Sequence, residues 1–191
     1  MNCAINCNLN AYLINERTDT VIRRATENDI PRVLALLSQV LEVHARIRPD
    51  IFIPGTTKYG EEDLKAMFLD EKRPVYVAEN ENGNVSGYVM CQLREPPFTS
   101  TMVSGRTLFI DDLCVDETAR GQHIGEALFR FAADQARRMG CRDVILNVWE
   151  GNDAAKRFYE KMGMRPRETQ MELLLTQTEM RFPSETEDRF S

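Results

Sequence analysis

Residues 110–125 read IDDLCVDETARGQHIG, in which the end of a strand runs into a short loop that opens a helix. The strand is predicted to cover residues 107–115. Backbone N–H groups at a helix start lack partners and carry partial positive charge, so they bind phosphate oxygens. Gly121 and Gly125 let the backbone approach a pyrophosphate closely, and Arg120 adds a positive charge. A phosphate-binding loop and an ordinary structural turn both fit this stretch when it is considered alone.

The spacing of apolar residues elsewhere predicts one mixed α/β domain over residues 21–176. Thr26 is expected to cap the first helix, with Asp29 in the capping-box position. Residues 1–20 are polar and patternless and are expected to form a flexible arm, and residues 177–191 a mobile tail. Strands are predicted at 21–24, 74–78, 85–93, 107–115, 144–148 and 171–175, and helices at 30–46, 61–69, 124–139 and 152–163.

Composition restricts the class of protein. The 191 residues are 42% hydrophobic and 28% charged, which is typical of a soluble globular domain. The formal net charge of −6 argues against nucleic-acid binding, which needs a basic face, and the chain has no apolar run that would span a membrane. Five cysteines, an odd number, indicate reduced thiols and a cytoplasmic location. Cys3 and Cys7 could share a metal, but no second Cys or His pair completes a site, so no metal is expected.

A second pattern follows the helix predicted at 124–139. Residues 152–163 read NDAAKRFYEKMG and contain N-x-x-A-x-x-F-Y with a closing glycine. This pattern resembles motif B of the GNAT superfamily of N-acetyltransferases. Residues 120–125 resemble motif A of the same superfamily, R/Q-x-x-G-x-G/A after a strand, with His123 in place of the usual middle glycine. Histidine tolerates unusual backbone angles better than most residues, and its side chain could face a phosphate or lie in solvent as part of a turn.

The resemblance implies the GNAT fold, an α/β (α+β) architecture with a central mixed, splayed β-sheet flanked by helices. Acetyl-CoA would then be the acetyl donor, lying in the split between the two core strands. Asn152 matches a residue that hydrogen-bonds the donor or caps the helix. Cys114 is expected to pack in a buried strand rather than to carry an acyl group. The implied donor-binding residues are Leu113, Cys114 and Val115 along the pantetheine arm, and Arg120, Gly121, Gln122, His123, Ile124 and Gly125 around the pyrophosphate.

Amide formation requires a general base. An amine with a pKa of about 10.4 is neutral only ~0.04% of the time at pH 7, so its proton has to be removed. Asp111 matches the acidic position of polyamine and aminoglycoside acetyltransferases, and Asp112 is the second candidate. Because neighbouring strand residues point to opposite faces, only one of the two is expected to face the acceptor. Asn147 stands where ribosomal-protein N-terminal acetyltransferases carry a glutamate base, which leaves Glu150 as a third candidate.

Tyr159 matches the tyrosine that protonates the coenzyme thiolate, although a core aromatic beside Phe158 would give the same pattern. The resemblance thus implies an acetyl-CoA-dependent N-acetyltransferase that acts on a small amine, an amino acid or a polyamine. A protein lysine or N-terminal acetyltransferase and a non-catalytic CoA-binding regulatory module are the alternatives. Residues 44–59 and 95–104 are expected to shape the acceptor pocket, and the apolar residues 164–175 would allow a homodimer.

Overall fold

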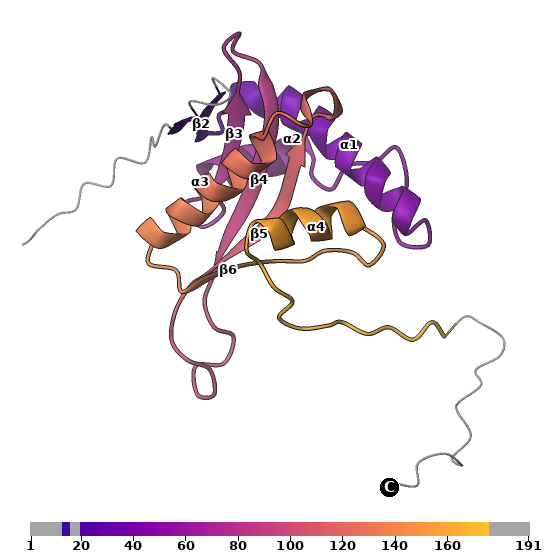
Figure 1. Cartoon of the computed structure of the whole chain (residues 1–191), viewed down its shortest axis with the longest axis vertical. Helices are drawn as coiled ribbons and strands as arrows, with labels where there is room; N and C mark the ends of the chain where they lie inside the picture. The colour runs from indigo at the N-terminus through magenta and orange to yellow at the C-terminus, as the bar shows by residue number, and fades with distance from the viewer. Residues whose placement is uncertain (1–12, 16–19, 176–191) are drawn as a thin grey trace, which may run out of the picture.

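The computed structural model describes residues 13–15 and 20–175, which form one six-stranded sheet with helices packed against it (Figure 1). The strands lie in chain order from β1 to β6, and all neighbours are antiparallel except β5 and β6, which are parallel. Among the described residues, no helix combines the length and the apolar character needed to cross a bilayer. The strands are β1 (Leu13–Asn15), β2 (Thr20–Arg24), β3 (Val75–Glu79), β4 (Val85–Arg94), β5 (Thr107–Val115) and β6 (Asp143–Leu146); the helices are α1 (Ile30–Ile47), α2 (Glu61–Leu69), α3 (Ile124–Arg138) and α4 (Asp153–Lys161), with 3-10 turns η1 (Glu27–Asp29) and η2 (Glu117–Ala119).

Two apolar cores cover the opposite faces of this sheet. Side chains alternate along β3, so that Tyr76 and Ala78 face the core under α3, whereas Val75 and Val77 face the core under α1 and α2. Tyr76 meets Phe131 of α3 edge-on, with ring centroids 4.9 Å apart. The predicted mixed sheet flanked by helices is thus confirmed, with α3 on one face and the α1–α2 pair on the other.

β5 and β6 separate part-way along their length. Their pairing runs from Thr107 with Asp143 to Ile110 with Leu146. β6 ends there, short of its predicted end, whereas β5 continues to Val115. The last residues of β5 therefore have no parallel strand on that side. This opening is the predicted splay of the sheet.

Thr26 and Asp29 mark the entry to α1, as the capping pattern predicts. The Asp29 carboxylate accepts hydrogen bonds from the Thr26 backbone N–H at 2.8 Å and from its hydroxyl at 3.0 Å, and it pairs with Arg23 at 2.7 Å. Burial alone would raise the pKa of the Asp29 carboxyl, but the hydrogen bonds from Arg23 and Thr26 outweigh it and lower the pKa. The turn η1 comes first, so α1 begins at Ile30.

Both ends of the described chain differ from the sequence-based expectation. Leu13–Asn15 form β1 inside the predicted flexible arm, because they pair with β2. The strand predicted at 171–175 is wrong: these residues form no strand, and the side chains of Met171 and Leu175 are 84% and 73% exposed. A strand needs a partner, and none of the described strands pairs with this segment. The tail predicted for 177–191 lies outside the described residues.

Candidate active site

A β-bulge brings two carboxylates together in β5. Met90 of β4 pairs with Asp112, whereas the next residue, Cys91, pairs with Ile110, so Asp111 has no partner across this strand pair. Such an extra residue breaks the alternation of side chains along a strand. Both aspartates consequently lie on the α1–α2 face of the sheet, where their hydrogen-bond partners are. The expectation that the two side chains point to opposite faces is wrong, because it assumed an unbroken strand.

Aromatic hydroxyls and a lysine bind these carboxylates. The hydroxyl of Tyr88, a residue buried in the α1–α2 core, donates to Oδ2 of Asp112 at 2.7 Å. Two residues of the loop between α1 and α2 reach Asp111. Lys58 Nζ donates to both of its oxygens, at 2.8 and 2.9 Å, and the Tyr59 hydroxyl donates to Oδ2 at 2.7 Å. The loop is thereby fastened to β5 at the bulge.

Asp112 is an unusually weak acid for an aspartate. Burial raises the pKa of its carboxyl to about 6, against opposing effects of the Tyr88 hydrogen bond and the Lys58 charge. The negative charge of Asp111 raises the pKa further, and the backbone N–H of Leu113 lowers it slightly. A carboxylate of this pKa is ionised at neutral pH yet accepts a proton more readily than an ordinary aspartate. It therefore suits the task of a general base.

Tyr159 lies on α4 and packs against the α3-side core. Its ring contacts Phe158 and Phe129, with centroids 5.0 and 6.0 Å apart. Burial raises the pKa of the Tyr159 hydroxyl above its usual value, and the charge of Asp112 raises it further. With its pKa raised above the usual value of about 10, the phenol stays protonated at neutral pH.

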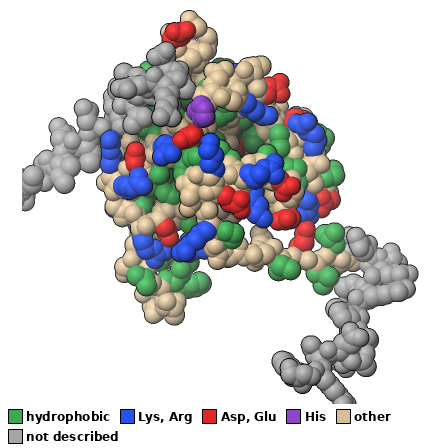
Figure 2. Space-filling model, in the orientation of Figure 1, with side chains coloured by type: hydrophobic (Ala, Val, Ile, Leu, Met, Phe, Trp, Pro, Cys, Tyr) green, Lys and Arg blue, Asp and Glu red, His purple; other side chains and the backbone are tan. Residues whose placement is uncertain are grey.

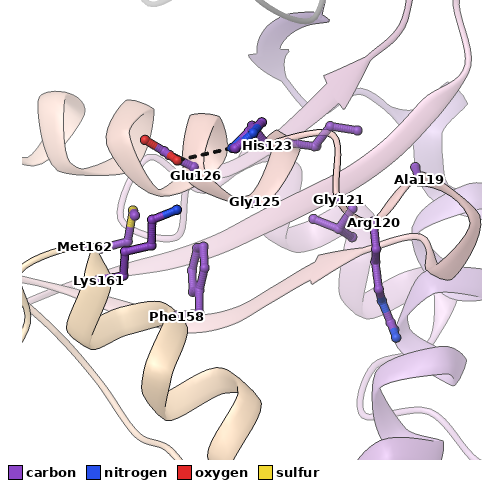
Figure 3. A pocket seen from close by; sticks show the side chains of 11 residues that line it. Ala119, Arg120, Gly121, His123, Gly125, Glu126, Phe158, Lys161 and Met162 are labelled. Atoms are coloured by element: carbon purple, nitrogen blue, oxygen red, sulfur yellow. Dashed lines mark ion pairs between the residues drawn. The ribbon is translucent and has the colours of Figure 1, made fainter.

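A cavity of about 270 Å³ lies where β5 leads into α3 (Figure 3). The loop and the first turn of α3 form one side, and α4 forms the other. Lys161 and Phe158 rise from α4 toward the first turn of α3, while Arg120 extends from the loop (Figure 3). Helix-start N–H groups and the Lys161 ammonium are groups that an anion requires, whereas the Arg120 side chain points away from Lys161 (Figure 3). The lining residues are Val115, Ala119, Arg120, Gly121, His123, Ile124, Gly125, Glu126, Phe158, Lys161 and Met162.

His123 adopts the backbone conformation that the usual glycine would supply. Its φ of 60° and ψ of 12° are left-handed, and it is the one non-glycine residue with a positive φ among those that the structure describes. The imidazole lies beside Glu126, with Nδ1 3.5 Å from Oε2, and is 62% exposed. The loop thus keeps its shape without the glycine.

The Asp116 carboxylate connects the start of the loop to helix α1. Its buried carboxylate accepts hydrogen bonds from the backbone N–H of Thr118 at 2.8 Å and from its hydroxyl at 2.5 Å. Arg32 of α1 forms an ion pair with it, and Gln39 adds a hydrogen bond at 3.2 Å. These bonds, that of the Thr118 hydroxyl above all, hold the pKa of Asp116 well below its usual range. Helix α1 therefore fixes the point at which β5 turns into the loop.

The profile of the Acetyltransferase (GNAT) family matches residues 38–164. The chain belongs to this family. The solved structure of a mutant of the BH1408 protein from Bacillus halodurans is 36% identical, with a TM-score of 0.77 and coverage of 81% of this chain and 98% of that one. The Bacillus subtilis protein YwnH, provisionally named a phosphinothricin acetyltransferase, is 30% identical over 146 residues, 74% of this chain and 82% of its own. The thialysine N-epsilon-acetyltransferase of Bos taurus is 28% identical over 148 residues, covering 75% and 82%.

The predicted donor residues of this GNAT N-acetyltransferase gather around the opening between β5 and β6. Leu113, Cys114 and Val115 lie on β5 beyond its pairing with β6, so that edge of their backbone is left without a neighbouring strand. The Cys114 thiol is buried 3.5 Å from the Leu36 carbonyl oxygen, and burial raises its pKa to about 12, so it packs as expected. Asn152 caps α4 through a 3.2 Å hydrogen bond to the first turn.

Of the two segments predicted to shape the acceptor pocket, residues 44–59 contact the bulge of β5, whereas residues 95–104 are largely exposed. Residues 44–59 hold the loop that binds the bulge, and Phe52 also meets Trp149 edge-on at 5.2 Å and His44 at 5.2 Å. This contact links the α1–α2 loop to the loop after β6. Residues 95–104, in contrast, lie between β4 and β5 and are largely exposed.

Sequence reasoning missed three contributors to the site: Tyr88, Lys58 and Lys161. Lys161 follows Phe158 by three positions on α4, so helical spacing could have placed it on the same face. Tyr88 and Lys58 reach the aspartates only through long-range pairing, which carries no local signal. Glu150, the third candidate base, is exposed in the loop after β6.

Replacing Lys161 by methionine is expected to raise the KM for acetyl-CoA about fivefold, because the cavity in which we expect the donor's pyrophosphate loses one cation. The effect should shrink at high ionic strength. Lys156→Met, on an exposed part of the same helix, is the matched control and should leave KM unchanged. Equal effects of the two substitutions in initial-rate measurements would contradict the role of Lys161.

Substituting His123 tests the left-handed residue of the loop. His123→Val is expected to lower the free energy of unfolding by about 1 kcal/mol, because a β-branched side chain is strained at positive φ. His123→Gly should change it by no more than about 0.5 kcal/mol, since relief of strain offsets the greater freedom of the unfolded chain. Urea denaturation measures both. A glycine variant of full stability with weaker acetyl-CoA binding would show that the imidazole faces a phosphate.

Proposed function

We propose that this GNAT protein transfers an acetyl group from acetyl-CoA directly to a primary amine, and that the acceptor is a small amine, an amino acid or a polyamine. The observation that carries the proposal is the pair formed by Asp112 and Tyr159. Burial raises the pKa of the Asp112 carboxyl to about 6, and burial with the Asp112 charge keeps the Tyr159 phenol protonated. Asp112 directly precedes the segment Leu113–Val115 that does not pair with β6, so a base and an acid are available for the reaction.

The donor is proposed to lie along the opening between β5 and β6. Its pyrophosphate would meet the first turn of α3, Arg120 and Lys161 in the 270 Å³ cavity. The amide groups of the pantetheine arm would pair with the free backbone edge of Leu113–Val115, like an added strand. This path leads the thioester toward Asp112 and Tyr159, where a backbone N–H of β5 would polarise its carbonyl.

Asp112 is proposed to take a proton from the acceptor's ammonium group, directly or through water, while Asp111 binds that ammonium. Proton transfer from an ammonium group of pKa about 10.4 to an ordinary aspartate of pKa about 3.9 is unfavourable in free energy. The raised pKa of Asp112, about 6, lowers this cost by about 3 kcal/mol. The neutral amine then attacks the thioester, the C–S bond breaks, and the thiolate takes the proton of the Tyr159 hydroxyl. The second proton of the amine nitrogen restores the Tyr159 hydroxyl, and Asp112 releases its proton to water.

The charge of the site supports a cationic acceptor. Two adjacent carboxylates lie on the α1–α2 face of the sheet, and the whole chain carries a formal net charge of −6. On the face shown in Figure 2, acidic and basic side chains are interspersed rather than gathered into the basic surface that nucleic acid needs. The bovine relative is named for the side-chain amine of an amino acid, thialysine. A free amine is therefore the acceptor that we favour over a protein.

An acceptor screen with detection of released coenzyme thiol tests the proposal. The panel should hold polyamines, amino acids, amino sugars and peptides with a lysine or a free N-terminus. We expect turnover on free amines. Turnover on peptides alone would assign a protein acetyltransferase instead. Tight binding of acetyl-CoA without turnover on any amine would assign the non-catalytic regulatory module.

We also propose that the protein forms a homodimer whose contact includes residues 165–175. Met171, Leu173 and Leu175 are 84%, 64% and 73% exposed, and β6 is one of the two edge strands of the described sheet. Light scattering should find a dimer for the native chain and a monomer for the double variant Leu173→Glu, Leu175→Glu. Leu69→Glu changes an equally exposed leucine elsewhere and should remain a dimer. A native monomer would contradict the proposal.

A further inference from the structure

Lys58 occupies the place at which the proposed function requires an acceptor amine. Its Nζ donates to both carboxylate oxygens of Asp111, at 2.8 and 2.9 Å, and its positive charge also reaches Asp112. The side chain is a primary ammonium on a flexible stem and is 48% exposed, so it can move within the site. The chain therefore presents to its own acidic pair the same group that the proposed reaction acetylates.

The other four lysines of the chain have different surroundings. Lys65 pairs with Glu61 and Glu62 on the surface of α2, at 2.9 and 2.8 Å. Lys161 lines the donor cavity on the far side of β5. Lys72 and Lys156 are exposed. Among all five, Lys58 is the one whose ammonium is paired with an aspartate of the bulge.

We propose that Lys58 is a self-acetylation site, which the enzyme modifies from its own bound acetyl-CoA when no other acceptor occupies the acidic pair. The inference rests on the proposed function, because it uses the same donor, base and acid. The ammonium of Lys58 gives one proton to Asp112. Its neutral nitrogen then bonds to the acetyl carbonyl carbon, the C–S bond breaks, and the thiolate takes the proton of Tyr159. The second proton of the nitrogen restores Tyr159, and Asp112 releases its proton to water.

The ion pair makes this reaction slow but position-specific. Burial alone would lower the pKa of Lys58, but the hydrogen bonds and charge of Asp111 outweigh it and raise the pKa. Nearly all of the amine is then protonated at pH 7, as it would be for any ammonium bound to this carboxylate. The fixed position compensates in part, because a group held beside its reaction partner reacts as if it were highly concentrated.

Acetylation would remove the ion pair with Asp111. An acetylated lysine carries no charge, so it no longer neutralises this carboxylate. Of the two loop residues that reach Asp111, only Tyr59 would still pair with it as before. Asp111 would then be open to the ammonium of an incoming amine. We expect the modified enzyme to have a lower KM for cationic amines than the unmodified one.

The test is to incubate the purified protein with acetyl-CoA and no acceptor, then to follow intact mass and map the acetylated peptides. We expect one acetyl group per chain, on Lys58, at a rate at least about tenfold above that of Lys65. Tyr159→Phe should slow the labelling of Lys58 about 100-fold, and its circular dichroism and acetyl-CoA affinity confirm that it is folded. Lys58→Arg should abolish the label, and Lys65→Arg should leave it unchanged.

Each of the following results would overturn the inference. Even labelling of all five lysines, or equal labelling of Lys58 in Tyr159→Phe, would show simple chemical acetylation by the thioester. A rate constant that rises with protein concentration would show transfer between molecules. An amine screen on the same preparation separates the two hypotheses. If a free amine is acetylated while Lys58 stays unlabelled, self-acetylation is rejected and the proposed function stands. If acetyl-CoA binds but neither the amine nor Lys58 is acetylated, both the proposed function and self-acetylation are rejected.

Discussion

Replacing Tyr159 by phenylalanine is expected to lower kcat about 100-fold, with little change in the affinity for acetyl-CoA. The variant keeps the aromatic ring that packs against Phe158 and Phe129 and loses only the hydroxyl. Without that hydroxyl, a coenzyme thiolate whose thiol pKa is about 8.5 leaves unprotonated or takes a proton from water. Thiol release at saturating acetyl-CoA measures the loss.

Tyr76→Phe is the matched control for this substitution. Tyr76 is a buried tyrosine on the α3 side of the sheet, packed against Phe131, but it lies on β3, which β4 separates from β5. Its loss of a hydroxyl should leave kcat within about twofold. Because burial and Asp112 raise the pKa of Tyr159, the native enzyme should keep its acid through pH 9. An equal fall of kcat in both variants, or none in Tyr159→Phe, would make Tyr159 a packing residue only.

The parts of the site that can be predicted from the sequence are those whose geometry depends only on residues close to one another in the chain. The loop at 120–125 lies between a strand and a helix, so its backbone shape follows from a few neighbouring residues. His123 shows how far this holds, since its left-handed backbone follows from its place in the loop rather than from its residue type. Asn152 likewise caps α4, because capping needs only the next turn of the helix.

The parts that the sequence misses depend on which residues meet across the fold. The bulge at Asp111 exists only because β4 and β5 pair in two registers, one on each side of it. The brace between Asp116 and Arg32 joins a loop to a distant helix. The apolar stretch at 171–175 predicts a strand, yet a strand forms only where another one pairs with it.

Replacing Asp112 by asparagine is expected to lower kcat/KM about 1000-fold at pH 7.5, because an amide cannot take the proton of the amine. The side chain keeps its size, and its carbonyl oxygen still accepts the hydrogen bond of Tyr88. In the native enzyme the pH profile of kcat/KM should rise with pH through a midpoint near 6, where Asp112 ionises. The small residual kcat/KM of Asp112→Asn should not show this rise with pH. Asp111→Asn should raise the KM for the amine and still show the rise of kcat/KM through a midpoint near 6.

Asp112→Asn is also expected to raise the free energy of unfolding at pH 8 by about 1–3 kcal/mol. The pKa of Asp112 is about 6 in the folded protein and lies near 3.8 in the unfolded chain, so the unfolded chain loses this proton first as pH rises. The protonated carboxyl therefore favours folding fully below pH 4, and this contribution is lost as the pH rises through 6. Asparagine has no charge to bury, so its advantage is small at pH 4 and complete at pH 8. Urea denaturation at both pH values measures it, and a variant less stable than the native protein at pH 8 would show that the buried charge does not strain the fold.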